Sequence, residues 1–120
     1  MSNELIAKKC IPCEGNMPHL MAGEIEEFHK QIPDWEIAEW HHLMKTFKFA
    51  DFAEALMFTN KVGALSESED HHPDIELSWG KVTIKLFTHA VDGLSENDFI
   101  LAAKIDTFSS ASSPFFSPPA

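Results

Sequence analysis

One stretch decides the fold: residues 75–89, with the sequence IELSWGKVTIKLFTH. Apolar and polar side chains alternate through residues 75–79, and the phase of the alternation flips after Gly80-Lys81. Alternation with a period of two is typical of a strand with one buried face, and a glycine between two such runs favours a turn or a bulge. The stretch therefore predicts a β-hairpin with strands at residues 75–79 and 82–89.

A second hairpin is predicted upstream. Alternation begins at Trp35 and Ile37, and it resumes after Glu39 through a run of larger side chains, which are Leu43, Lys45, Phe47 and Phe49. We predict strands at residues 35–39 and 42–49. The pair His41-His42 then falls at the hairpin turn, where we expect solvated side chains.

Two helices complete the pattern. Asp51 is a plausible N-cap for a helix over residues 51–66, whose apolar face would contain Phe52, Ala55, Leu56, Thr59, Val62 and Gly63. Ser95 and Asp98 form an S-x-x-D capping box, and Leu94 and Phe99 have the spacing of a hydrophobic staple. They predict a second helix over residues 96–108, with an apolar stripe of Phe99, Ala102, Ala103 and Ile105.

The element order predicts an α+β fold. Strand, strand, helix, strand, strand, helix is the pattern of a four-stranded antiparallel sheet with helices packed on one face. With 120 residues the chain fits one domain, which we assign to residues 1–108. Its first 30 residues read as a loose N-terminal arm with a short helix near residues 23–31. The Ser- and Pro-rich segment 109–120 is expected to be a frayed tail.

Composition and charge exclude several classes of partner. The formal net charge is −10, which repels polyanions, so we expect no binding to nucleic acid. No apolar run of about 18 residues and no signal-like start is present, so we expect neither membrane attachment nor secretion. The expected location is the cytoplasm. Cys10 and Cys13 are the two cysteines, too few for a disulfide framework.

Three histidines flank the hairpin at residues 75–89. His71 and His72 precede its first strand, and His89 ends its second. Pro73 forces His72 into an extended conformation, and pairing of the two strands brings His72 near His89. Imidazole both donates and accepts protons near neutral pH, so such a cluster suits general acid–base catalysis. Two adjacent histidines at the start of a strand often have no catalytic role. The third histidine at the other end of the hairpin favours a catalytic cluster.

The histidines and the acidic residues before them are part of a longer string of residues with defined spacings. It reads Glu67-Ser68-Glu69-Asp70-His71-His72-Pro73, six residues, Gly80-x-Val82, five residues, Thr88-His89, three residues, Gly93-Leu94-Ser95-x-x-Asp98. The string resembles the signature of the pterin-4a-carbinolamine dehydratases. The resemblance extends in weaker form over residues 35–108, and the segment at residues 10–15 is similar to the start of some plant and bacterial members.

The resemblance implies a site and a reaction. It implies that His71, His72 and His89 are catalytic and line a pterin pocket, supported by Asp70, Pro73, Thr88 and Asp98. For Asp98 the spacing makes helix capping its main role. Glu67, like Asp70, is close enough in sequence to orient an imidazole, and we include it among the substrate-binding residues.

The implied reaction is dehydration of 4a-hydroxytetrahydropterin to quinonoid dihydropterin in tetrahydrobiopterin recycling. It makes the chain a hydro-lyase that needs no metal and no other cofactor. We assign proton transfer to His71 and His89, and binding of the pterin ring to His72. The family forms dimers or tetramers, so we expect a homodimer or a homotetramer.

Two alternatives stay open. One is a zinc site, built from His71, His72 and His89, or from Cys10 and Cys13 with His19 or His41. The other is a protein-binding module without catalysis, because animal members of the resembled family also serve as dimerisation partners of a homeodomain transcription factor. The acidic charge does not exclude such a protein partner.

Overall fold

The computed structural model describes residues 4–7 and 20–110. Its elements are η1 (Glu4–Ala7), α1 (Ala22–His29), β1 (Glu36–Ala38), β2 (His42–Lys48), α2 (Phe52–Glu69), β3 (Asp74–Ser78), β4 (Lys81–Leu86), η2 (His89–Val91) and α3 (Glu96–Ser110). Four strands form one antiparallel sheet in the order β1-β2-β4-β3. The predicted α+β class and element order are confirmed.

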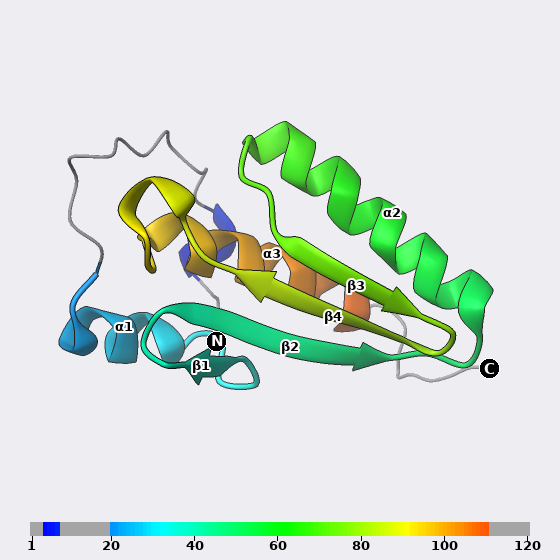
Figure 1. The fold of residues 1–120 in the computed structure, drawn as a ribbon, viewed down its shortest axis with the longest axis horizontal. Coiled ribbons are helices and arrows are strands. Elements are labelled where there is room, and N and C mark those ends of the chain that lie inside the picture. The colour runs from blue at the N-terminus through cyan, green and yellow to red at the C-terminus, as the bar shows by residue number, and fades with distance from the viewer. Residues whose placement is uncertain (1–3, 8–19, 111–120) are drawn as a thin grey trace.

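The helices pack against the sheet and against one another. In Figure 1, α3 lies behind the sheet, and α2 runs alongside β3. Contacts join α2 to α3, β3 and β4, whereas α3 is also covered by η1 and α1. Within the described residues, no helix combines the length and the apolar character that a membrane span requires.

The β3–β4 hairpin confirms the alternation on which the prediction rested. Ile75 lies opposite Ile84, and Leu77 lies opposite Val82. Trp79 and Gly80 form the turn, and Trp79 is largely exposed, so the predicted buried face ends before it. A Cβ at Gly80 would lie 3.3 Å from the carbonyl oxygen of Phe49, so a side chain here would require a shift of a few tenths of an ångström at the end of β2.

The predicted second strand of this hairpin is too long. β4 ends at Leu86, and Thr88 instead pairs with Gly93 in an isolated bridge, with its N–H donating to the Gly93 carbonyl at 2.8 Å. This bridge closes a short loop, so His89 begins the 3-10 helix η2 rather than ending a strand. Asp92 ends η2 in the left-handed conformation.

The first hairpin is shorter than predicted by a residue at each end of β1 and at the far end of β2, and its turn is tight. Glu39 and Trp40 have φ angles of 57° and 56°, and the His41 N–H donates to the Ala38 carbonyl at 2.9 Å. Each left-handed residue with a Cβ costs about 1–2 kcal/mol, so contacts elsewhere must hold this turn. At the other end Trp35 lies before β1, buried in the core.

The buried face of α2 agrees with the predicted one at Ala55 and Val62 and differs elsewhere. Phe52 and Leu56 are exposed, together with Met57, whereas Ala55, Phe58, Val62 and Ser66 are buried. The reason is tertiary: Phe58 packs on the rings of Phe47 and Phe49, with centroids 4.7 and 5.0 Å apart. The Asp51 N-cap is confirmed, since its carboxylate accepts the Glu54 N–H at 2.9 Å.

The core centres on α3. Its predicted stripe of Phe99, Ala102, Ala103 and Ile105 is buried, and so are Ile100 and Leu101, because other elements cover its remaining sides. Leu5 of η1 is buried too, so the predicted loose arm is ordered at residues 4–7. Residues 8–19 and the tail from 111 onward lie outside the described residues.

Candidate functional site

The end of α2 delivers the two adjacent histidines. Asp70 caps the helix in the left-handed conformation, and the N–H groups of Asp70 and His71 donate to the last helical carbonyls. Pro73 then leads into β3. Just before the cap, Glu69 forms an ion pair with Lys104 of α3, with 2.6 Å between Oε2 and Nζ. The loop that carries His71 and His72 is therefore fixed to α3 at its root.

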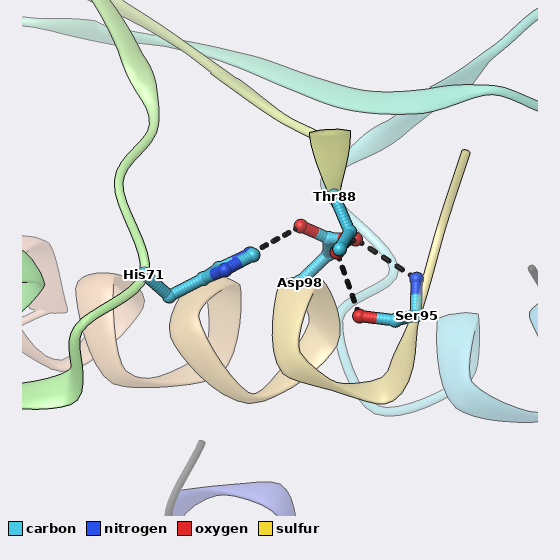
Figure 2. Close-up of polar contacts among 4 residues, drawn as sticks. All are labelled: His71, Thr88, Ser95 and Asp98. Atoms are coloured by element: carbon cyan, nitrogen blue, oxygen red, sulfur yellow. Dashed lines mark hydrogen bonds and ion pairs between the residues drawn. The ribbon is translucent and has the colours of Figure 1, made fainter. Parts of the chain in front are cut away.

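Asp98 links this loop to the end of β4. Its side chain is fully buried in the first turn of α3, and Figure 2 shows its carboxylate between His71 and Thr88. Oδ1 lies 2.6 Å from Nε2 of His71, whereas Oδ2 accepts the Thr88 hydroxyl at 2.8 Å and the Ser95 N–H at 2.9 Å. The Thr88 and Ser95 hydroxyls lie 2.7 Å apart.

This network assigns the proton on His71. A carboxylate accepts hydrogen bonds, so the Nε2–H of His71 donates to Asp98. Nδ1 is then the ring nitrogen that can take or give a proton. The His71 side chain is only 11% exposed, which restricts the orientation of its ring. A histidine oriented by a buried carboxylate is an arrangement suited to general acid–base catalysis.

Asp98 both caps α3 and orients His71. Its bond to the Ser95 N–H is one half of the predicted capping box. Its bond to His71 joins residues 27 positions apart in sequence. The prediction that capping is its main role was therefore incomplete. Ser95 was missed as a member of the network, although its place in the capping box was the signal that could have identified it.

His72 lies on the solvent side of the same loop. Its Nε2 pairs with a Glu67 carboxylate oxygen at 2.5 Å, as the sequence spacing suggested. The His72 side chain is 54% exposed, so this pair contributes little to the free energy of unfolding. Because His72 is exposed, a ligand can reach its imidazole from solvent.

His89 belongs to a different set of contacts. Its ring packs on Phe87 with centroids 4.2 Å apart, while Thr88 between them is buried against Asp98. The hydrogen bonds of the described residues thus join the histidine loop to the hairpin through His71 and Thr88. The predicted approach of His72 to His89 stays a prediction.

The expectation that His41 and His42 are solvated turn residues was wrong for His42. His42 begins β2 and is only 8% exposed. Nε2 of His41 lies 3.0 Å from the Asp92 carboxylate, and its ring packs on Phe87 with centroids 4.8 Å apart. His41, at the end of the β1–β2 turn, thus lies against the loop after β4, and His42 lies beside it at the start of β2.

Burial gives His42 a predictable effect on stability. Desolvation, helped by the charges of Lys85 and His41, lowers the pKa of His42 below its ordinary 6.5. The unfolded chain therefore takes up this proton at a higher pH than the folded chain, so the stabilisation is complete above about pH 6.5. It is lost as the pH falls through the folded-state pKa.

We expect His42→Gln to weaken the acid dependence of the free energy of unfolding. Urea unfolding of wild type and variant between pH 5 and 8, at constant salt, measures it. Parallel curves for the two proteins would show that His42 does not titrate differently in the folded and unfolded chains.

Metal ligation has no support in the described residues. No group of three or more His, Cys, Asp or Glu side chains in residues 4–7 and 20–110 is arranged to hold a metal ion. This applies to the suggested set of His71, His72 and His89. Cys10, Cys13 and His19 lie outside the described residues.

Comparison with known proteins places the chain in a family. Residues 18–108 match the model of the family described as pterin 4 alpha carbinolamine dehydratase. A protein of Alkaliphilus metalliredigens is 53% identical over 105 residues, covering 87% of this chain and 95% of its own. One of Rubrobacter xylanophilus is 49% identical over 104 residues, covering 87% and 97%. Both are named "Putative pterin-4-alpha-carbinolamine dehydratase".

Two solved structures share the fold. A transcriptional coactivator/pterin dehydratase from Brucella melitensis superposes with a TM-score of 0.70 at 28% identity, covering 74% of this chain and 96% of that one. A pterin dehydratase-like protein identified as a RuBisCO assembly factor in the alpha-carboxysome gives a TM-score of 0.51 at 27% identity, covering 61% and 83%. Because residues 18–108, most of this chain, match the family model, the chain belongs to the pterin-4a-carbinolamine dehydratase family.

Proposed function

We propose that this chain dehydrates 4a-hydroxytetrahydropterin to quinonoid dihydropterin and water. The observation that carries the proposal is the fully buried Asp98 carboxylate bonded to Nε2 of His71, both within residues 18–108 that match the family model. This pairing prepares one imidazole for proton transfer. Family membership supports the substrate class.

The reaction needs two proton transfers. A proton goes to the 4a-hydroxyl, the C4a–O bond breaks, and water leaves. A proton is removed from N5, and the electron pair of the broken N5–H bond forms the new C4a=N5 double bond. Positioned acids and bases typically contribute about 10²–10⁴-fold each, so histidines suffice, and we propose no metal or other cofactor.

We assign proton transfer to His71 through its Nδ1, and to His89 as its counterpart. His71 has the stronger support, because its orientation is fixed by Asp98. His72, exposed on the neighbouring position of the loop, is assigned to binding the pterin ring, with Glu67 orienting its imidazole. Asp70, Pro73 and Thr88 shape the loop and the strand end that carry these side chains.

A physiological role follows as part of the same proposal. We propose that the chain acts as a hydro-lyase in tetrahydrobiopterin recycling in the cytoplasm, as a homodimer or homotetramer. The exposed apolar side chains of Phe52, Leu56 and Met57 on α2 support self-association, since such a cluster is stabilised by burial. Light scattering of the purified protein measures the number of subunits.

Stopped-flow decay of 4a-hydroxytetrahydropterin, with and without the protein, tests the proposed activity. Repeating the measurement across pH 5.5–8.5 also reports the ionisation of the catalytic groups. We expect acceleration that is proportional to protein concentration. Decay at the uncatalysed rate at every pH would exclude the dehydratase function.

A second candidate is a protein-binding role without catalysis. The structural relatives named as a coactivator/pterin dehydratase and as an assembly factor favour it, together with the exposed apolar face of α2. A chain that bound a protein partner and left the carbinolamine decay unchanged would support this candidate. Full catalytic activity would weaken it.

A further inference from the structure

A row of three contacting rings connects the β1–β2 turn with His89. The ring of Phe87 contacts both imidazoles in a tilted arrangement, with centroids 4.8 Å from His41 and 4.2 Å from His89. The three residues come from three segments: the turn before β2, the chain leaving β4, and the start of η2. The row is thus a tertiary contact.

The turn that supplies His41 is held in place from both sides. Nε2 of His41 pairs with the Asp92 carboxylate at 3.0 Å, and Nδ1 of His41 lies 3.3 Å from Nδ1 of the buried His42. Asp92 in turn ends η2, with its N–H donating to the His89 carbonyl at 3.2 Å. His41 therefore contacts η2 at its C-cap and, through Phe87, at its first residue.

The backbone of the turn agrees with this constraint. Glu39 and Trp40 both adopt the left-handed conformation, which side chains with a Cβ rarely take. Such a conformation persists where the surroundings determine it. At the end of this turn His41 contacts the ring of Phe87 and the Asp92 carboxylate, which is itself largely exposed.

We propose that His41 and Phe87 are positioning residues for His89, so that the β1–β2 turn belongs to the functional site. The inference rests on the proposed function in one respect: it assigns His89 a part in dehydration. The contact with the Phe87 ring restricts the rotation of the exposed His89 imidazole. The contact of His41 with the same ring keeps Phe87 in place.

Replacement of the ring at position 87 tests the proposal. Phe87→Leu keeps an apolar side chain but removes the ring, whereas Phe87→Tyr keeps the ring. A ring pair contributes enough to change an equilibrium, or a rate, by about 2- to 12-fold, so we expect kcat of Phe87→Leu to fall by that factor. Phe87→Tyr should retain wild-type kcat, and His41→Ala should resemble Phe87→Leu.

Histidine-ring NMR supplies a readout that does not need activity. The His89 resonances are identified by their loss in His89→Gln. Ring-current effects from Phe87 should displace them in wild type and in Phe87→Tyr. In Phe87→Leu and His41→Ala they should move toward the positions of a freely rotating imidazole.

Phe49→Leu is the matched control for loss of a ring. Phe49 is partly buried and packs on the core residue Phe58 with centroids 5.0 Å apart, at the opposite end of β2 from His41, so this variant should lose stability and leave kcat and the His89 resonances unchanged. Unaltered His89 resonances in both Phe87→Leu and His41→Ala would overturn the positioning role. Altered resonances in a protein that never accelerates dehydration would keep that role and reject the proposed function.

Discussion

His71→Ala is expected to lower kcat for 4a-hydroxytetrahydropterin dehydration by about 10²–10⁴-fold, the usual contribution of one positioned acid or base. The expectation follows from the site: the imidazole is nearly buried and is bonded through Nε2 to a carboxylate that has no exposure to water. Stopped-flow kinetics with purified variants measures the effect. A wild-type rate in His71→Ala would refute the assignment.

Asp98→Asn tests whether catalysis requires the His71 imidazole to be oriented by Asp98, or only requires the imidazole to be present. Two donors, the Thr88 hydroxyl and the Ser95 N–H, meet at one oxygen of Asp98, so the amide oxygen of an asparagine would keep that place. Its NH₂ group would then face Nε2 of His71, and the proton of His71 would move to Nδ1. We expect kcat to fall by about 10²-fold or more while KM changes little.

His72→Ala is the control within the same loop. This histidine is exposed and bonded to an exposed carboxylate, so its loss should raise KM more than it lowers kcat. Equal losses of kcat in His72→Ala and His71→Ala would remove the distinction between binding and proton transfer. Thermal unfolding of each variant checks that the fold is retained.

Local pattern was enough to predict the strands and helices. Ile75 and Leu77 face Ile84 and Val82 because alternation sets which side chains share a face of a hairpin, and the chain segment itself contains that information. The Asp51 N-cap was predictable for the same reason, since the group it accepts is only three residues away. Packing between segments that are distant in the sequence could not be predicted from such local patterns.

Two errors came from contacts that the alternation of side chains does not reveal. The face of α2 was misjudged because Phe58 packs on Phe47 and Phe49, whose positions depend on the finished sheet. The end of β4 was misplaced because the Thr88–Gly93 bridge closes a loop that the alternation does not reveal.

The site shows the same limit. The motif identified His71 and Asp98, but their hydrogen bond spans 27 residues and follows only from how α3 packs under the histidine loop. His41 was treated as a solvated turn residue, and its partner Asp92 lies 51 residues away. A spacing rule finds the members of a site, whereas the folded chain determines which of them touch.

Lys104→Met is expected to lower the free energy of unfolding by up to about 3 kcal/mol, the lower end of the loss for a fully buried ion pair, because this pair is partly buried. The side chains of Glu69 and Lys104 are only 7% and 17% exposed and meet at 2.6 Å. Loss of Lys104 leaves the Glu69 carboxylate without this counter-charge inside the protein. Urea unfolding at pH 7 measures the change.

The double variant Glu69→Leu/Lys104→Met shows whether the loss comes from the remaining charge. With both partners apolar, most of the stability should return, because a buried ion pair is often no better than a hydrophobic contact of similar volume. The exposed pair of Lys30 and Glu27 is the control, and Lys30→Met should change the free energy of unfolding little, because solvent screens this pair. Because Glu69 directly precedes the cap that leads into His71, Lys104→Met should also reduce kcat, and the double variant should restore it in part. If Lys104→Met were no more damaging than Lys30→Met, α3 would hold the histidine loop through Asp98 rather than through this ion pair.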